Sequence, residues 1–192
     1  MKFNDYTFEK AIRCSLFQVV SFITTTGLFN DDAAQWPHVT WIILAVCMFC
    51  GACAGSTTGG FKSVRVLTLL KVVRNEFRHI IHPNAVLPVK VNGKAISTSG
   101  VYKHITFIFI YFLVFVAGGI ILLFTGVDFN TAIGASVATL SNVGTGIGLV
   151  GPGNSYVFFP IATKWVLMLM MILGRVELFS LITLLSRSFW RN

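Results

Sequence analysis

Two short glycine-containing segments, residues 24–28 and 141–146, each end an apolar stretch that is too short to cross a membrane. A longer apolar stretch follows each of them. Irregular backbone inside a bilayer is tolerated only where it is buried in protein or lines water. Its carbonyl oxygens can then replace the hydration shell of a cation. The pattern therefore predicts two re-entrant pore loops in an ion-conducting protein, and it does not indicate an enzyme.

Composition places the chain in a lipid bilayer. Apolar residues make up 55% of the 192 residues, charged residues make up only 11%, and the mean hydropathy is +0.77. A soluble domain is about one-quarter charged. Because the apolar excess lies in runs of helical length, we expect an all-α membrane protein.

The net charge of +8 is distributed unevenly along the chain. Residues 62–103 contain eight Lys or Arg and one acidic residue, whereas residues 14–61 and 104–163 contain no Lys or Arg. Cations next to membrane spans mark the cytoplasmic side. Since the charge has this topological cause, no nucleic-acid partner is expected. The expected sidedness is residues 62–104 and the C-terminus inside, with the loops 28–38 and 145–156 outside.

Hydrophobic periodicity and turn residues predict the order of the elements. Short Val/Ile alternation in residues 84–100, between Pro and Gly residues, indicates a loop with a small hairpin. Asp128 or Asn130 is expected to cap the second short helix. The expected helices are residues 8–23, 39–53, 62–81, 105–124, 128–140 and 157–185.

The two glycine segments belong to an internal repeat. Residues 20–27 align with residues 137–144, and in both a short helix ends in a hydroxyl- or amide-bearing turn, followed by a glycine and a longer helix. A complete unit consists of a span, a pore helix, a filter and a second span, and the first copy lacks its opening span. The expected domains are a first pore repeat at 1–81, a cytoplasmic linker at 82–104 and a second pore repeat at 105–192.

A chain with two such segments supplies only part of a filter. Cation filters commonly use four segments around one axis. Either two copies of the chain pair, or the chain is part of a longer protein. The missing opening span of the first repeat favours the longer protein.

Four motifs carry a resemblance to a known family. In this order and topology, residues 17–27, 54–62, 141–146 and 174–178 together resemble the Trk/Ktr/HKT superfamily of potassium transporters, and its bacterial TrkH type most closely. The resemblance covers essentially the whole chain, as the third and fourth repeats of that family. It implies K⁺ uptake across the bacterial inner membrane, a homodimer, and a cytoplasmic nucleotide-binding regulatory subunit of the TrkA type.

The resemblance places the filter glycines at Gly27 and Gly144. The C-terminal ends of the two short helices would direct partial negative charge towards a cation, and neither glycine segment contains Lys or Arg. An ordinary helix-capping loop, with glycine present for its positive φ, is the alternative. The expected filter residues are Thr25, Thr26, Gly27, Asn142, Val143 and Gly144. Backbone oxygens of these residues are expected to bind K⁺, and they include those of Thr26, Gly27, Val143 and Gly144.

A run of residues with poor helix propensity follows the first spanning stretch. By resemblance this run is a gating loop just inside the filter, and a flexible helix break without a role is the alternative. A phosphate-binding loop is excluded because Phe61 stands where such a loop requires Lys, and no βαβ pattern surrounds it. The residues of the run are Gly55, Ser56, Thr57, Thr58, Gly59 and Gly60.

Arg175 lies within the last apolar stretch. An Arg at the centre of a membrane helix costs roughly 2.5–3.5 kcal/mol on insertion scales, so a function is expected of it. By resemblance Arg175 faces the pore and forms a barrier to K⁺. A structural pair with Glu177 is the alternative, but residues two apart do not share a helix face.

Other classes of protein fit parts of the sequence. A secondary carrier also uses broken, glycine-rich helices around a midplane substrate site. A membrane redox enzyme would use Cys47, Cys50 and Cys53, but residues of this spacing on one helix are better explained as small apolar side chains. The channel-like potassium transporter is favoured, and no cofactor is expected apart from the transported K⁺ itself.

Overall fold

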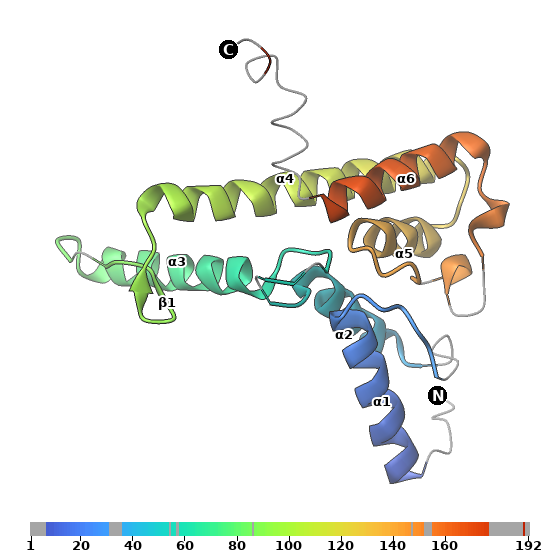
Figure 1. Cartoon of the computed structure of the whole chain (residues 1–192), viewed down its shortest axis with the longest axis horizontal. Coiled ribbons are helices and arrows are strands. Elements are labelled where there is room, and N and C mark those ends of the chain that lie inside the picture. Colours follow the sequence, from blue (N-terminus) through green and yellow to red (C-terminus); the bar gives the residue numbers. More distant parts are fainter. Residues whose placement is uncertain are drawn as a thin grey trace.

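The computed structural model describes residues 7–30, 36–53, 55–56, 58–85, 87–146, 148–151, 155–176 and 190. The described part of the chain is mostly α-helical, as the sequence predicts. Figure 1 shows the elements in chain order. They are α1 (Phe8–Ile23), α2 (His38–Cys50), α3 (Ser63–Ile81), β1 (Lys90–Val91), β2 (Lys94–Ala95), α4 (Thr98–Leu123), α5 (Phe129–Leu140), the 3₁₀ turns η2 (Gly148–Val150) and η3 (Tyr156–Phe158), and α6 (Ile161–Arg175).

Helix α4 is longer than its sequence suggests. It begins at Thr98 rather than at residue 105, because the Ser97 hydroxyl caps it by accepting a hydrogen bond from the Gly100 N–H (3.2 Å). Among the described helices, α4 is the one that is long and apolar enough to cross a membrane. Its first turns are polar and the rest of the helix is apolar.

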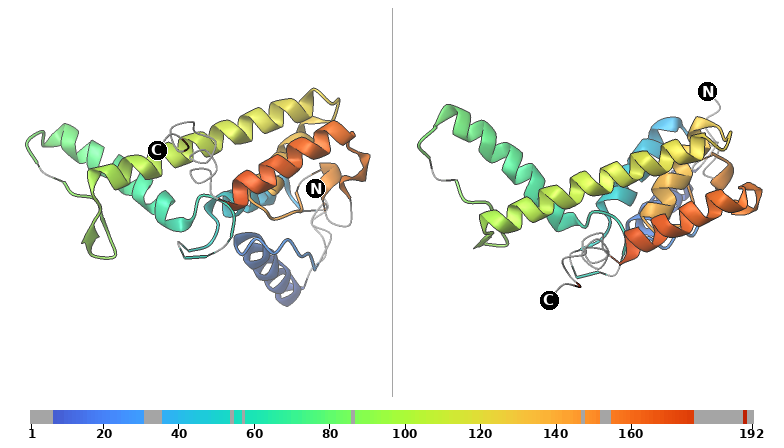
Figure 2. Two further views of the ribbon diagram at one scale, coloured as in Figure 1. Left: turned by 45° about the horizontal axis from the view of Figure 1, so that its top comes forward. Right: turned by 90° about the horizontal axis from the view of Figure 1, so that it is seen from above.

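Helices α3 and α4 contact each other and are joined by a hairpin, and the view from above in Figure 2 shows them crossing at a wide angle. Strands β1 and β2 pair antiparallel, and Asn92 and Gly93 make the turn with positive φ at both positions (50° and 78°). Lys71 of α3 donates a hydrogen bond to the Lys90 carbonyl (2.6 Å). Asn75 likewise donates to the Leu87 carbonyl (3.0 Å). These bonds hold the expected small hairpin against α3.

Helix α5 forms the centre of the fold. Figure 2 shows it enclosed by α4 and α6, and α2 also contacts it. Small side chains allow this close packing: Ala132, Ala135 and Ala138 are fully buried. The buried Ser136 hydroxyl donates to the Phe115 carbonyl of α4 (3.1 Å). Nine of the twelve residues of this helix are thus buried, and these nine all lie between Thr131 and Leu140.

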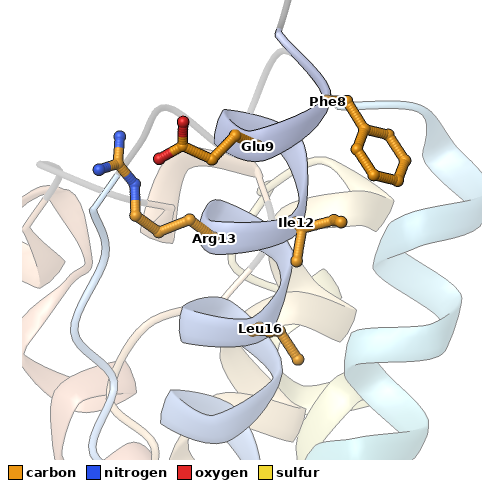
Figure 3. A pocket seen from close by; sticks show the side chains of 5 residues that line it. All are labelled: Phe8, Glu9, Ile12, Arg13 and Leu16. Atoms are coloured by element: carbon orange, nitrogen blue, oxygen red, sulfur yellow. The ribbon is translucent and has the colours of Figure 1, made fainter.

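Helix α1 has a different environment from α5, although the two are expected to be equivalent. Phe8 and Leu16 are 81% and 61% exposed. Figure 3 shows these residues with Ile12, Glu9 and Arg13 around a pocket near the start of α1. None of the residues that line this pocket belongs to the glycine segment that follows the helix. An apolar face of α1 is therefore left uncovered by the described residues.

The last helix begins later than expected. Residues 156–158 form a 3₁₀ turn, and α6 starts at Ile161 rather than at residue 157. Pro160 is the cause, because a proline forces the residue before it into extended backbone, and Phe159 has φ −71° and ψ 142°. The expected continuation of this helix beyond residue 176, Glu177 included, lies outside the described residues.

The cap of α5 provides a stability test. The Asp128 carboxylate accepts a hydrogen bond from the Thr131 N–H (3.1 Å). Hydrogen bonds from the side chain and backbone of Thr131 lower the pKa of Asp128 from its ordinary value. The carboxylate therefore stabilises the fold above its ordinary pKa, and this contribution is lost as pH falls through the lowered folded-state pKa. Asp128→Ala should lower the free energy of unfolding by about 1 kcal/mol, unchanged across neutral pH.

Asp128→Asn is the control for this cap, because Asn caps helices about as well as Asp. Thermal unfolding midpoints in detergent at neutral pH compare the two variants. Equal midpoints for Asp128→Ala and Asp128→Asn would show that the cap does not stabilise α5.

Candidate ion-conduction site

The backbone turns that end α1 and α5 have the same conformation. The first turn comprises residues 24–27 and the second comprises residues 141–144. In the first turn φ is positive at Thr25 (53°) and Gly27 (71°), and in the second it is positive at Asn142 (56°) and Gly144 (87°). Positive φ at a β-branched residue such as Thr25 is rare and strained. Strain of this kind is concentrated at functional sites.

The hydrogen bonds of the two turns also correspond one to one. The N–H groups of Thr26 and Gly27 donate to the Ser21 carbonyl, at 2.9 and 3.5 Å. In the second turn those of Val143 and Gly144 donate to the Ala138 carbonyl, at 2.9 and 3.2 Å. Thr25 and Asn142 in addition donate from their N–H groups to the Phe22 and Thr139 carbonyls (3.2 and 3.1 Å). With the Thr26 and Val143 bonds, these close each helix C-terminus in the Schellman arrangement. The backbone hydrogen bonds of the two turns are therefore alike, whereas the repeat of a whole pore unit stays a prediction.

Glycine is not the capping residue in either turn. The left-handed position that ends each helix is occupied by Thr25 and Asn142. Gly27 and Gly144 lie two residues further on and adopt positive φ again. The helix-capping explanation therefore does not account for the two glycines, and their conformation needs another cause.

The two turns contact each other directly. The Thr145 hydroxyl donates a hydrogen bond to the Gly27 carbonyl (3.1 Å). A Cβ built on Gly27 would collide with the carbonyl oxygen of Val143. The backbones of residues more than a hundred positions apart therefore pack without side chains between them, which requires glycine.

The loop between α2 and α3 runs against the second turn. This connecting loop (residues 51–62) is longer than the expected break, because Gly51 adopts φ 58° and ends α2 at Cys50 rather than at residue 53. The Phe61 N–H donates to the Phe49 carbonyl (2.8 Å) and folds the loop back on α2. A Cβ on Gly59 would collide with the carbonyl of Ser141. The loop and the second turn are therefore in backbone contact.

Hydroxyls inside the connecting loop bond to its own backbone. The Thr58 hydroxyl accepts from the Ala52 N–H (3.4 Å), and the Ser56 hydroxyl accepts from the Thr58 N–H (3.2 Å). No described atom of the protein lies within 4 Å of a Cβ built on Gly55. Thr57 lies outside the described residues. The contact with the second turn is thus made at the Gly59 side of the loop.

Helix α6 passes the second turn at its C-terminal end. Asn142 donates from its side-chain amide to the Met171 carbonyl (3.1 Å). Gly174 lies so close to the Leu140 carbonyl that a Cβ could not fit there. The exposed Arg175 is the next residue and the last of α6. Arg175 therefore follows directly on the residue that contacts the base of the second turn.

Several residues near the turns were not anticipated from the sequence. Tyr156 donates a hydrogen bond to the Gly144 carbonyl (3.0 Å). Tyr111 and Ser141 share a buried hydrogen bond between their hydroxyls (3.2 Å). Of these residues, Thr145 could have been found from the sequence, because it lies next to Gly144 in the glycine segment 141–146. The other contacts depend on packing between distant segments.

The structure brings together most of the residues that the sequence predicts for the site. Both turns, Gly59 and the end of α6 lie next to each other. Among the described residues, no group of three or more His, Cys, Asp or Glu side chains is arranged to hold a metal ion. The two turns can offer backbone oxygens, and the role of these oxygens in ion coordination stays a prediction.

A comparison with family models decides the class of protein. The model described as "TrkH: Cation transport protein" matches residues 2–191. The chain belongs to the TrkH family. This confirms the resemblance drawn from the four motifs, and it places the chain in a family of transport proteins rather than enzymes.

Named relatives of this TrkH-family chain are potassium uptake proteins. Trk system potassium uptake protein TrkH of Escherichia coli (strain K12) is 39% identical over 181 residues, which are 94% of this chain and 37% of that protein. TrkI of Halomonas elongata is 33% identical over 177 residues, 92% of this chain and 36% of that protein. The chain therefore spans less than two-fifths of the length of these relatives.

A solved structure supports the same assignment. The crystal structure of the potassium transporter TrkH from Vibrio parahaemolyticus matches with a TM-score of 0.88 and 39% identity, covering 97% of this chain and 40% of that one. The helical fold is thus that of part of a TrkH protein. The expected domain boundaries at residues 81 and 104 stay predictions.

Proposed function

We propose that this chain lines a K⁺ pathway across a bacterial inner membrane, with the backbone oxygens of the two turns as ion ligands. The observation that carries the proposal is the paired geometry: two equivalent turns, each ending a short helix, meet at Gly27 and Val143. Family membership supports K⁺ as the ion, since the relatives are potassium uptake proteins.

The two turns offer oxygens rather than charged side chains. Each carbonyl oxygen has two lone pairs, so Gly27 and Gly144 can accept a hydroxyl and still face a cation. The C-terminal ends of α1 and α5 add partial negative charge. Because filters commonly use four segments, we propose that these two turns form two walls of the filter. The re-entrant pore repeats expected from the sequence belong to this proposal.

The proposed orientation follows from the basic surface of the α3–α4 hairpin. Arg65 of α3 places its guanidinium 3.7 Å from the centre of the Phe107 ring on α4. Cations at this end of α4 favour a cytoplasmic location. Residues 62–104 would then lie inside, and the loops 28–38 and 145–156 outside, although parts of these loops lie outside the described residues.

We also propose that the connecting loop is a gate and that Arg175 is a barrier. Gly59 contacts the base of the second turn, so movement of the loop would reach the filter directly. From family membership we extend the proposal to a cytoplasmic nucleotide-binding regulatory subunit of the TrkA type and a homodimer. A secondary carrier on broken helices remains the alternative mechanism, since the break between α2 and α3 also suits it.

Arg175→Ala should increase K⁺ flux or weaken rectification. Unit charges 4 Å apart at an effective dielectric of about 20 interact by roughly 4 kcal/mol. Even about 1.4 kcal/mol of this changes ion occupancy tenfold. The K⁺-over-Na⁺ preference should stay, because the proposed filter lies at the turns. Flux and reversal potentials in proteoliposomes measure both quantities.

Lys164→Ala is the control for Arg175, since it removes a cation at the other end of the same helix. A folded Arg175→Ala protein with unchanged flux and rectification would contradict the barrier. Failure of both Arg175→Ala and Glu177→Ala to fold would identify a structural pair instead.

Ion flux tests the proposed function as a whole. Protein expressed from the native gene is reconstituted into proteoliposomes, and rubidium tracer uptake and electrical current are recorded. A channel-like pathway gives cation current down its electrochemical gradient without a coupled solute. Uptake that requires a second solute, with no uncoupled current, would favour the carrier, and the absence of any K⁺ or Rb⁺ flux would refute both mechanisms.

A further inference from the structure

The carbonyl of each proposed filter glycine accepts a hydroxyl from outside its own turn. Tyr156 donates to Gly144 (3.0 Å), and Thr145 donates to Gly27 (3.1 Å). Resting on the proposed function, we propose that Tyr156 and Thr145 are specificity-determining positioning residues, which orient these two carbonyls for K⁺. Each of the two residues contacts its turn by a hydrogen bond from its hydroxyl to a backbone oxygen.

The Tyr156 hydroxyl is held in place by packing. Its ring packs against the buried cluster that contains Leu122 and Val150, and it stacks on Phe159 at 6.0 Å between centroids. Burial raises the pKa of Tyr156 to about 12, so the phenol keeps its proton at physiological pH and remains a donor. A rigid ring therefore presents a fixed donor to the Gly144 carbonyl.

The loop that carries this ring is tied to α5. The Gly146 N–H donates to the Val150 carbonyl (2.9 Å). The Leu149 N–H donates to the hydroxyl of the buried Thr131 (3.0 Å). These bonds hold the segment that follows the second turn. The turn itself is held by the hydrogen bond from Asn142 to α6.

Thr145 acts between the repeats rather than within one. Its hydroxyl belongs to the segment after the second turn, and its acceptor belongs to the first turn. The bond therefore fixes the distance between the two walls of the proposed filter as well as the orientation of the Gly27 carbonyl. Cavity size and the field strength of the carbonyl dipoles are the two quantities on which K⁺ selectivity is thought to depend.

Loss of either hydroxyl has a predictable direction. The donor hydrogen carries positive partial charge, so it weakens the field that the carbonyl oxygen offers a cation, and the bond restricts the rotation of the carbonyl. Without the donor, the oxygen exerts a stronger field and can move closer to a small cation, which favours Na⁺ relative to K⁺. One hydrogen bond of ordinary strength corresponds to a roughly two- to tenfold change in the ratio of K⁺ to Na⁺ permeability.

The test uses Tyr156→Phe, which keeps the ring and its packing, and Thr145→Val, which keeps the branched shape. Thr145→Ser is the conservative variant that keeps the donor. Tyr102→Phe removes a phenol hydroxyl from an exposed position on α4 and is the matched control. All are made in the native gene, and K⁺ and Na⁺ fluxes are measured in proteoliposomes at equal driving force.

We expect Tyr156→Phe and Thr145→Val to lower the K⁺/Na⁺ flux ratio, with Thr145→Ser and Tyr102→Phe close to the parent. A parent ratio in Tyr156→Phe overturns the role of Tyr156. If Tyr156→Phe fails to insert into the membrane, the Gly27 carbonyl decides the role of the hydroxyls. Equal K⁺/Na⁺ flux ratios in Thr145→Val and Thr145→Ser would then overturn the proposal. Loss of total flux at an unchanged ratio identifies a structural role and also overturns it. A parent protein without K⁺ flux refutes the proposed function itself.

Discussion

Gly27→Ala is expected to abolish selective K⁺ flux, whereas Gly144→Ala should retain a reduced flux with altered selectivity. Both glycines adopt positive φ, at 71° and 87°, and a Cβ in that conformation costs roughly 1–2 kcal/mol. At Gly27 the Cβ would in addition collide with the Val143 carbonyl. At Gly144, by contrast, no atom of the described chain comes within 4 Å of it. The difference between the variants thus measures the contact between the turns.

Gly126→Ala is the matched control for this pair of variants. Gly126 has φ 80°, and among described residues nothing approaches its Cβ within 4 Å. It lies between α4 and α5, outside both turns. It should therefore show the conformational cost without a change in selectivity. Tracer flux and K⁺/Na⁺ ratios decide the matter, and equal effects of Gly27→Ala and Gly144→Ala would show that the turns need not touch.

Gly59→Ala should increase K⁺ flux several-fold and make it less dependent on a regulatory subunit. The added methyl group would collide with the Ser141 carbonyl, and the connecting loop would have to move away from the second turn. Deletion of residues 55–60 should have the same effect. Since the filter carbonyls would remain, the K⁺/Na⁺ ratio should stay near that of the parent.

Gly55→Ala controls for the effect of adding a methyl group to the connecting loop. It adds the same methyl group to the same loop, at a position with no described neighbour within 4 Å. We expect parent-like flux from it. The gate would be refuted if Gly59→Ala or the deletion folds but conducts less than the parent, and a changed ion ratio would show that the loop supports the filter instead.

Local sequence signals predicted the helices where those signals are strong. Helix α1 has the predicted bounds, Phe8–Ile23, and α3 begins one residue later than predicted. Asp128 caps α5 as the sequence suggested. The errors came from single residues that override periodicity: Ser97 starts α4 early, Gly51 ends α2 early, and Pro160 delays α6.

The sequence predicted where the two turns lie, but it did not predict how they are built. The repeat and the glycines indicate where two turns should lie, because both are written in local sequence. The left-handed conformation of Thr25 has no such signal, because a β-branched residue rarely adopts it, whereas Asn142 gave a weak one, because Asn is found there after glycine. Backbone contacts such as Gly59 with Ser141 and Gly174 with Leu140 depend on how helices pack.

The proposed ion ligands can be located in a crystal. Crystals of the native protein are grown in Rb⁺, and the anomalous scattering of Rb⁺ locates the cation. We expect a peak in contact with the backbone oxygens of Thr26, Gly27, Val143 and Gly144. An Rb⁺ peak bound elsewhere in the membrane region, with none at the two turns, would contradict the proposal.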